Sequence, residues 1–124
     1  MKIENIKFKA KCLDTGEWVE GDLKHSTSYV GIGYPSSVFP DVPIVHRVDP
    51  DTVCMFTGLT DCKGNEIWEH DLIHFVGHKP TAEVLWSEED YAFMVAASEN
   101  EPLYWLSDVP EIGKIERVGN KFDK

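Results

Sequence analysis

The chain has 124 residues and a formal net charge of −10, from 12 basic and 22 acidic side chains. This length fits one compact domain, built either as a single unit or as two lobes at residues 1–58 and 66–124 that share a core. An acidic surface repels phosphate groups, which disfavours direct nucleic-acid binding and attachment to anionic membranes. Basic protein partners, or solubility alone, fit this charge better.

Hydrophobic residues make up 42% of the sequence, enough to build a core without a metal or disulfide bonds. No apolar run approaches the roughly 20 residues that span a bilayer, and the N-terminal segment lacks the apolar stretch of a secretory signal. The three cysteines, Cys12, Cys54 and Cys62, are an odd number in a short chain and argue against a secreted disulfide scaffold. We therefore expect a cytoplasmic protein with no cofactor.

Apolar and basic residues alternate strictly from residue 6 to residue 12. One face carries Ile6, Phe8, Ala10 and Cys12, and the other carries Lys7, Lys9 and Lys11. This period of two predicts a strand with one face in water. Residues 13–16 have turn chemistry and residues 17–23 predict the return strand, so the chain opens with a β-hairpin.

The segment from residue 24 to residue 50 has a weaker pattern. Glycine, serine and proline are frequent in residues 25–42, and they predict a long loop between short strands at 28–32 and 43–48. The 24–42 loop is either free to meet a partner or an irregular surface loop packed on the protein. Residues 52–57 are apolar on both faces, which predicts a central strand.

The second half of the chain predicts a meander of strands at residues 72–76, 81–86 and 91–96, followed by a last strand at 112–118. Tyr91, Phe93 and Val95 would share one face of the third strand. Residues 103–108 predict a helical turn. The fold class is therefore mainly β: an N-terminal antiparallel hairpin region and a C-terminal twisted meander resembling a small SH3-like barrel.

Two bends lie between these halves, and five residues are predicted to shape them as turn or hinge residues: Gly58, Asp61, Gly64, Glu69 and Asp71. Gly58 is expected to end the central strand. The carboxylates are expected to accept hydrogen bonds from backbone N–H groups of the turns. Trp68 would hold the bends against the core.

Three segments resemble the YopX family of small phage and prophage proteins: IKFKA at residues 6–10, FTGLTDCKGNEIWEHDLI at 56–73 and RVGNKF at 117–122. The family's usual tyrosine is Trp68 here, and its usual glycine in the second bend is His70. If that bend requires a positive φ, histidine tolerates it at a cost of about 1 kcal/mol. The resemblance implies a β-rich fold, a phage or prophage origin and the cytoplasm of a bacterial host, and it implies no particular activity.

Two kinds of chemistry are weighed and not favoured. The ligand types of a zinc site are present in Cys54, Cys62, His70, His74 and His78. However, strand residues four apart are separated by about 13 Å, so we expect no metal site. Glu66, Glu69 and Asp71 offer paired carboxylates for hydrolysis, yet turn formation explains them better, and we expect no catalytic residues.

A binding surface is the third interpretation, and its candidate residues are Trp68, Trp86, Tyr91 and Trp105. These aromatics either form a groove for a basic or aromatic peptide or belong to the core. The sequence thus favours a non-enzymatic accessory protein that binds a phage or host protein through its β-lobe and the 24–42 loop, with self-association as a variant.

Two rival functions remain open. A nucleic-acid-associated protein would need its basic residues on one face, and these are Lys7, Lys9, Lys11, Arg47, Lys79 and Arg117. A related rival is an acidic mimic of nucleic acid that occupies the groove of a host protein.

Overall fold

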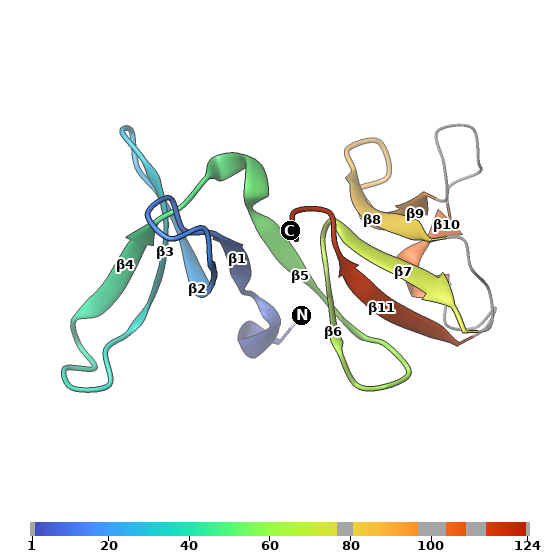
Figure 1. The fold of residues 1–124 in the computed structure, drawn as a ribbon, viewed down its shortest axis with the longest axis horizontal. Coiled ribbons are helices and arrows are strands. Elements are labelled where there is room, and N and C mark those ends of the chain that lie inside the picture. Colours follow the sequence, from blue (N-terminus) through green and yellow to red (C-terminus); the bar gives the residue numbers. More distant parts are fainter. Residues whose placement is uncertain (1, 77–80, 97–103, 109–113, 124) are drawn as a thin grey trace. The chain divides into compact units, whose positions relative to one another are not determined.

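The computed structural model describes residues 2–76, 81–96, 104–108 and 114–123. The residues group by their mutual contacts into two compact units, unit 1 (Met1–Phe56) and unit 2 (Thr57–Lys124) (Figure 1). Antiparallel strands dominate both units, so the predicted mainly β fold is confirmed. No helix in the described part is long and apolar enough to cross a membrane.

Unit 1 is an antiparallel sheet with the strand order β4-β3-β2-β1-β5. Its strands are β1 (Phe8–Lys11), β2 (Trp18–His25), β3 (Val30–Pro35), β4 (Pro43–Arg47) and the first residues of β5 (Cys54–Thr60), which continues into unit 2, with short 3-10 turns at Ile3–Asn5 and Pro50–Thr52. The opening hairpin is confirmed, because β1 pairs with β2 from Phe8 opposite Gly21 to Lys11 opposite Trp18. β5 has a strand neighbour on each side, β1 and β6, so the predicted central position is also confirmed.

The core of unit 1 is small and centres on Ala10, Ile32 and Val48, which are buried. The sheet curls over this core at one end. Cys12 forms an isolated bridge with Val48, and the Leu13 N–H donates to the Arg47 carbonyl at 3.0 Å. The end of β1 is thereby joined to the residues that follow β4.

The predicted water-facing side of the first strand is wrong for Lys9, whose exposed fraction is 9%. Aromatic rings cover this lysine face. The ammonium groups of Lys9 and Lys11 lie 4.6 and 4.7 Å from the Trp18 ring centroid, and that of Lys7 lies 4.7 Å from the Phe56 ring. Cation–π attraction and the apolar stems of the lysines make this burial favourable.

The long loop predicted for residues 24–42 is wrong where β2 and β3 run through it, and β3 confirms in part the short strand predicted at 28–32. β2 runs to His25, and β3 occupies Val30–Pro35, paired with β2 and β4. The glycines that suggested a loop serve close packing instead. A Cβ at Gly31 would lie 2.9 Å from a methyl of Val45, and one at Gly33 would lie 3.3 Å from its other methyl. Only residues 36–42 connect β3 to β4.

Unit 2 contains the meander with the strand order β10-β9-β8-β7-β11. Its strands are β7 (Asp71–Phe75), β8 (Ala82–Ser87), β9 (Ala92–Ala96), β10 (Tyr104–Trp105) and β11 (Ile115–Asn120), with β6 (Glu66–Trp68) before them and a 3-10 turn at Leu106–Asp108. Its buried core consists of Ile67, Ile73, Val84, Val95, Leu106 and Ile115. The described strands form an open sheet, with β10 and β11 at opposite edges, and not a closed barrel.

Gly58, His70 and Tyr91 lie at or near the predicted turns, and each has a positive φ angle. Gly58 has φ +85° but lies inside β5, which continues to Thr60, so the predicted strand end is wrong. The Thr57 hydroxyl donates to the Ile67 carbonyl and accepts from the Leu59 N–H. These two hydrogen bonds keep the residues on either side of Gly58 in the strand. His70 has φ +68°, so the second bend does require a positive φ at the position where the family usually has glycine.

Tyr91 is the third such residue, with φ +50°. It lies in the turn before β9, and 76% of its surface is exposed. It therefore does not share the packed face of Phe93 and Val95, as the sequence pattern had suggested. Tyr91 lies in the turn, before the regular alternation of β9 begins at Ala92.

Candidate protein-binding surface

Asp71, at the start of β7, is completely buried. One of its oxygens accepts from the Trp68 N–H at 2.7 Å and from the Arg117 Nε at 2.9 Å. The other accepts from the Asn120 Nδ2 at 2.8 Å. Backbone, guanidinium and amide donors bind both oxygens of this carboxylate, so it ties the second bend to β11 and is engaged in structure and not in acid–base chemistry.

Asp61 shapes the first bend in the same way. Its carboxylate accepts from the N–H groups of Lys63 (2.9 Å), Asn65 (2.8 Å) and Arg117 (2.9 Å). Burial by itself raises the pKa of Asp61, but these hydrogen bonds outweigh burial and hold the pKa below its ordinary value. The sequence predicted the bonds within the turn; it did not reveal that Arg117 joins both carboxylates.

The lowered pKa of Asp61 makes the stability of unit 2 depend on pH. A carboxyl whose pKa is lower in the folded state stabilises the fold above its unfolded pKa, near 3.9, and loses that contribution as the pH falls through the folded pKa. We expect Asp61→Asn to be less stable than the wild type at pH 7 and to lose less stability between about pH 5 and pH 2. Urea denaturation at a series of pH values measures this. Asp108→Asn, at an exposed position, should follow the wild-type curve, and parallel curves for Asp61→Asn would contradict the assignment.

The histidines and cysteines considered as metal ligands have other surroundings. His70 Nδ1 lies 2.9 Å from Glu83 Oε2, and the ring packs edge-on against Phe122 at 5.2 Å. His74 Nε2 lies 2.8 Å from Glu116 Oε1. The described residues contain no group of three or more His, Cys, Asp or Glu side chains arranged to hold a metal. His78 lies outside the described residues.

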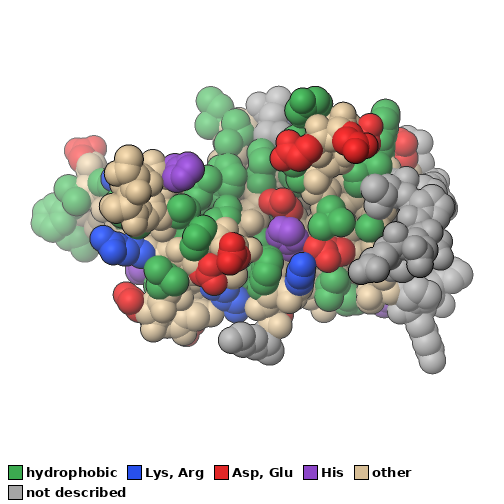
Figure 2. Space-filling model, turned by 90° about the horizontal axis from the view of Figure 1, so that it is seen from above, with side chains coloured by type: hydrophobic (Ala, Val, Ile, Leu, Met, Phe, Trp, Pro, Cys, Tyr) green, Lys and Arg blue, Asp and Glu red, His purple; other side chains and the backbone are tan. Residues whose placement is uncertain are grey.

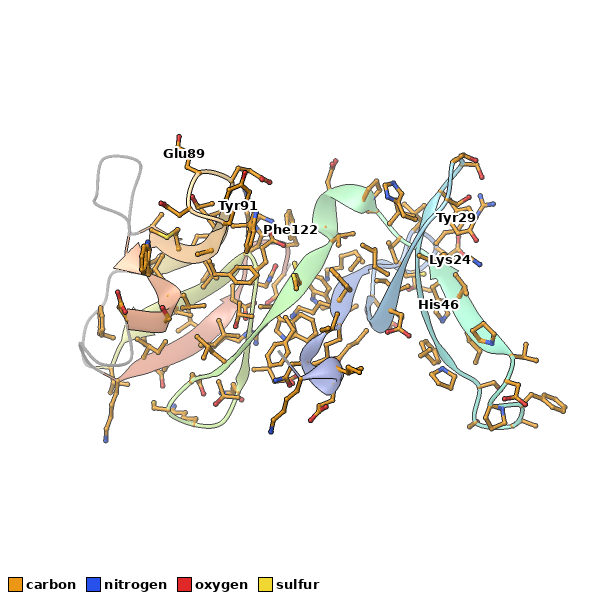
Figure 3. All side chains as sticks on the ribbon, turned by 180° about the vertical axis from the view of Figure 1, so that it is seen from behind. Lys24, Tyr29, His46, Glu89, Tyr91 and Phe122 are labelled. Carbon is orange, nitrogen blue, oxygen red and sulfur yellow. The ribbon has the colours of Figure 1, made fainter. Side chains whose placement is uncertain are left out.

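The four aromatic candidates have different exposures. Trp68 is 4% exposed, so its side chain is buried and is not a surface contact. Trp86, Tyr91 and Trp105 are exposed by 39%, 76% and 52%. Trp86 packs edge-on against Phe93 with ring centroids 5.1 Å apart, and Figure 3 shows Tyr91 with Glu89 beside it on the β8–β9 turn. Whether these three bind a peptide remains a prediction.

A larger set of exposed apolar side chains lies in unit 1, at the connection between β3 and β4. The exposed fractions are 72% for Val38, 67% for Phe39, 60% for Val42 and 39% for Ile44. We call residues 36–42 the arm tip. The hydroxyl of Ser36 accepts from the N–H groups of Val38 and Phe39, so local hydrogen bonds give the tip a defined shape. Such a group of large apolar side chains in water is typical of an interaction site.

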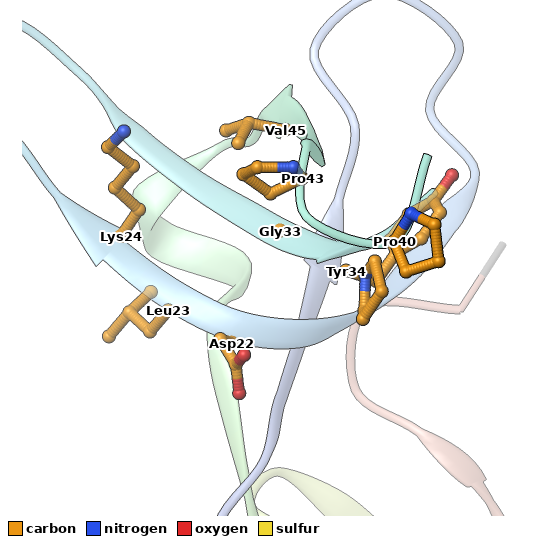
Figure 4. A pocket seen from close by; sticks show the side chains of 9 residues that line it. Asp22, Leu23, Lys24, Gly33, Tyr34, Pro40, Pro43 and Val45 are labelled. Carbon is orange, nitrogen blue, oxygen red and sulfur yellow. The ribbon is translucent and has the colours of Figure 1, made fainter. Parts of the chain in front are cut away.

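A groove of about 220 Å³ lies beside the arm tip (Figure 4). We call it the arm groove; it is lined by Asp22, Leu23, Lys24, Gly33, Tyr34, Pro35, Pro40, Pro43 and Val45. One wall is fixed by Tyr34, whose hydroxyl shares a hydrogen bond of 3.0 Å with His46 Nε2. The two rings also stack, with centroids 5.7 Å apart. The arm groove is therefore a mainly apolar surface with charged side chains among its lining.

The charge is distributed unevenly between the two units. Residues 1–56 contain six basic and eight acidic side chains, a net charge of −2. Residues 57–124 contain six basic and fourteen acidic side chains, a net charge of −8. Figure 2 shows acidic side chains gathered over unit 2 on one face. The apolar arm tip and arm groove thus belong to the nearly neutral unit.

The basic residues considered for nucleic-acid binding are distributed over β1, β4 and β11. Lys9 and Lys11 of β1 lie against Trp18, Lys7 just before β1 lies against Phe56, and Arg117 is paired with Asp71. The guanidinium of Arg47 lies 4.8 Å from the Tyr29 ring centroid, and Figure 3 shows Lys24, Tyr29 and His46 on the same sheet of unit 1. Lys79 lies outside the described residues.

Comparison with known proteins gives one match. A family model, the YopX protein family, matches residues 3–124. No curated protein and no solved structure matches the chain. The match spans all of the segments on which the resemblance was based, from the opening hairpin to β11. The chain belongs to the YopX protein family.

Proposed function

We propose that this chain is a non-enzymatic phage or prophage accessory protein, working in the bacterial cytoplasm, that binds another protein through the arm tip and arm groove. The observation that carries this proposal is the exposure of four large apolar side chains on one hairpin of unit 1. Burying such side chains in a partner is favourable by about 25 cal/mol for each Å² removed from water.

The backbone edge of β4 is a weaker binding site for a partner than the exposed apolar side chains of the arm. An added strand needs a row of free backbone groups along β4. Pro43 has no N–H to offer, and the Arg47 carbonyl already accepts from Leu13. Prolines and covered edges are features by which proteins prevent strand addition. The partner therefore contacts the apolar side chains of the arm.

Neither a hydrolase nor a nucleic-acid-binding protein has comparable support. Of the carboxylates considered for a hydrolase, Glu66, Glu69 and Asp71, that of Asp71 already accepts from the Trp68 N–H and the Arg117 Nε, and Glu69 Oε2 lies 3.7 Å from His70 Nε2. The basic residues lie on three strands, and several are covered by aromatic rings or paired with acids. A nucleic acid binds where cationic side chains line one accessible face.

One observation supports a second candidate function. Unit 2 has a net charge of −8, and Glu88, Glu89 and Asp90 crowd into one turn of it. A surface of this kind resembles a phosphate backbone and would suit the basic groove of a host nucleic-acid-binding protein. This binding would weaken steeply with salt, whereas binding through the apolar arm would not.

Capture experiments with matched variants test the proposed function. Wild type, Phe39→Ser and Tyr91→Ser are immobilised and exposed to lysate of bacteria carrying the phage or prophage, and retained proteins are identified by mass spectrometry. We expect the wild type and Tyr91→Ser to retain the same protein and Phe39→Ser to retain at least about tenfold less, because exposed aromatic anchors dominate interfaces. Equal retention by Phe39→Ser would contradict the proposal, and loss only with Tyr91→Ser would move the site to unit 2.

A further inference from the structure

The arm tip and arm groove have complementary sizes. The groove measures about 220 Å³, and Phe39 is not among the residues that line it. An apolar cavity of roughly 150 Å³ is enough to hold a benzene ring. The arm groove is therefore large enough for a phenylalanine ring, while the chain's own Phe39 remains 67% exposed beside it.

The two features are also complementary in charge. Asp41 is an exposed acid in the arm tip, and Lys24 is an exposed base that lines the arm groove (Figure 4). The ion pairs found among the described residues include neither of them. Asp22 also lines the groove, so an acidic tip would be attracted to the Lys24 side and repelled from the Asp22 side. The charges thus favour one orientation of an incoming tip.

We infer that a partner of the arm is a second copy of this chain, with the arm tip of each copy seated in the arm groove of the other. This inference rests on the proposed function, since it uses the same surface. The Phe39 ring of one copy enters the other copy's groove over Gly33 and beside Val45, and its Asp41 meets the other copy's Lys24. A two-fold axis makes both contacts at once and closes the assembly at a dimer.

The charge distribution permits this association. Two chains of net charge −10 repel each other, but the excess acid lies in unit 2. Unit 1 has a net charge of only −2, and screening over about 8–10 Å limits the effect of more distant charges. A contact confined to the arms therefore buries apolar side chains without bringing the acidic surfaces into the interface.

Charge reversal in the full chain tests the pairing. The wild type is expected to be a dimer by analytical ultracentrifugation over a concentration series, and Phe39→Ser to weaken it about thirtyfold or more. Lys24→Asp places two acids together and Asp41→Lys places two bases together, so each alone should weaken the dimer about tenfold. A mixture of these two variants restores both pairs across a mixed dimer and should recover wild-type affinity. Lys114→Asp and Glu89→Lys change the net charge equally in unit 2 and should leave the dimer unchanged.

Three results would overturn the inference of a dimer formed through the arms. A wild type that is monomeric at its highest soluble concentration excludes the second copy, while the proposed function still stands if Phe39-dependent capture persists. A dimer that survives Phe39→Ser and both charge reversals uses another surface. Failure of the mixture to recover affinity excludes the Asp41–Lys24 pairing. Circular dichroism and the thermal midpoint of each variant separate these outcomes from loss of folding.

Discussion

Replacing Asp71 with alanine is expected to lower the free energy of unfolding by about 3 kcal/mol or more, the largest effect we predict for a single substitution in unit 2. The side chain is fully buried and accepts hydrogen bonds from Trp68, Arg117 and Asn120. Alanine removes the acceptor from all three donors and leaves the Arg117 guanidinium, whose side chain is 27% exposed, without its carboxylate. Leaving a largely buried charge unpaired costs more than the pair itself contributes.

Urea denaturation followed by circular dichroism and tryptophan fluorescence measures this loss. Asp71→Asn retains an oxygen for the Trp68 N–H and should lose less stability than alanine. Asp108→Ala removes an exposed carboxylate and should change the stability by less than about 0.5 kcal/mol. A loss below about 1 kcal/mol for Asp71→Ala would show that β11 and the second bend are held by other contacts.

Gly21→Ala is expected to destabilise unit 1 by about 2–3 kcal/mol. Gly21 lies in the middle of β2, where the strand changes partner: Gly21 pairs with β1 and Asp22 pairs with β3. A Cβ at this position would lie 2.2 Å from the carbonyl oxygen of Gly33. The clashing atom belongs to the backbone of a paired strand, so no side-chain rotation can relieve it.

Gly33→Ala is the matched control for this prediction. Its Cβ would meet a methyl of Val45 at 3.3 Å, and that side chain can shift by a few tenths of an ångström. We expect Gly33→Ala to lose clearly less stability than Gly21→Ala in thermal and urea unfolding. Equal losses would mean that the cost arises from any side chain in this part of the sheet and not from the approach of two backbones.

The sequence predicted best those features whose cause is local. Strict alternation over residues 6–12 identified the first strand, and the spacing of Asp61 and Asn65 identified the turn between them. The comparison of motifs identified position 70, where the family usually has glycine, as one at which a positive φ was to be considered, and His70 has φ +68°. In each case the residues that determine the structure are neighbours in the chain.

The features that the sequence did not reveal depend on residues far apart. Asp71 binds Arg117 and Asn120 across 46 and 49 residues, and nothing in the pattern around β11 identifies its partners. The glycines of β3 suggested a loop in the sequence. They are instead needed to make room for the Val45 side chain, which is visible only in the folded sheet. Gly58 was wrongly expected to end a strand, since a positive φ within a strand and one at its end have the same sequence signal.

The long-range contacts of Arg117 also have a consequence for synthesis on the ribosome. All residues that pair within the sheet of unit 1 have been made once residue 56 is added, so this unit can fold while the rest of the chain is still being translated. In unit 2, Asp61 and Asp71 emerge early, but the donors of Arg117 and Asn120 emerge some 50 residues later. Until β11 has left the exit tunnel, the carboxylates of Asp61 and Asp71 remain hydrated. The two bends therefore lack the hydrogen bonds to β11 that hold them in the folded protein.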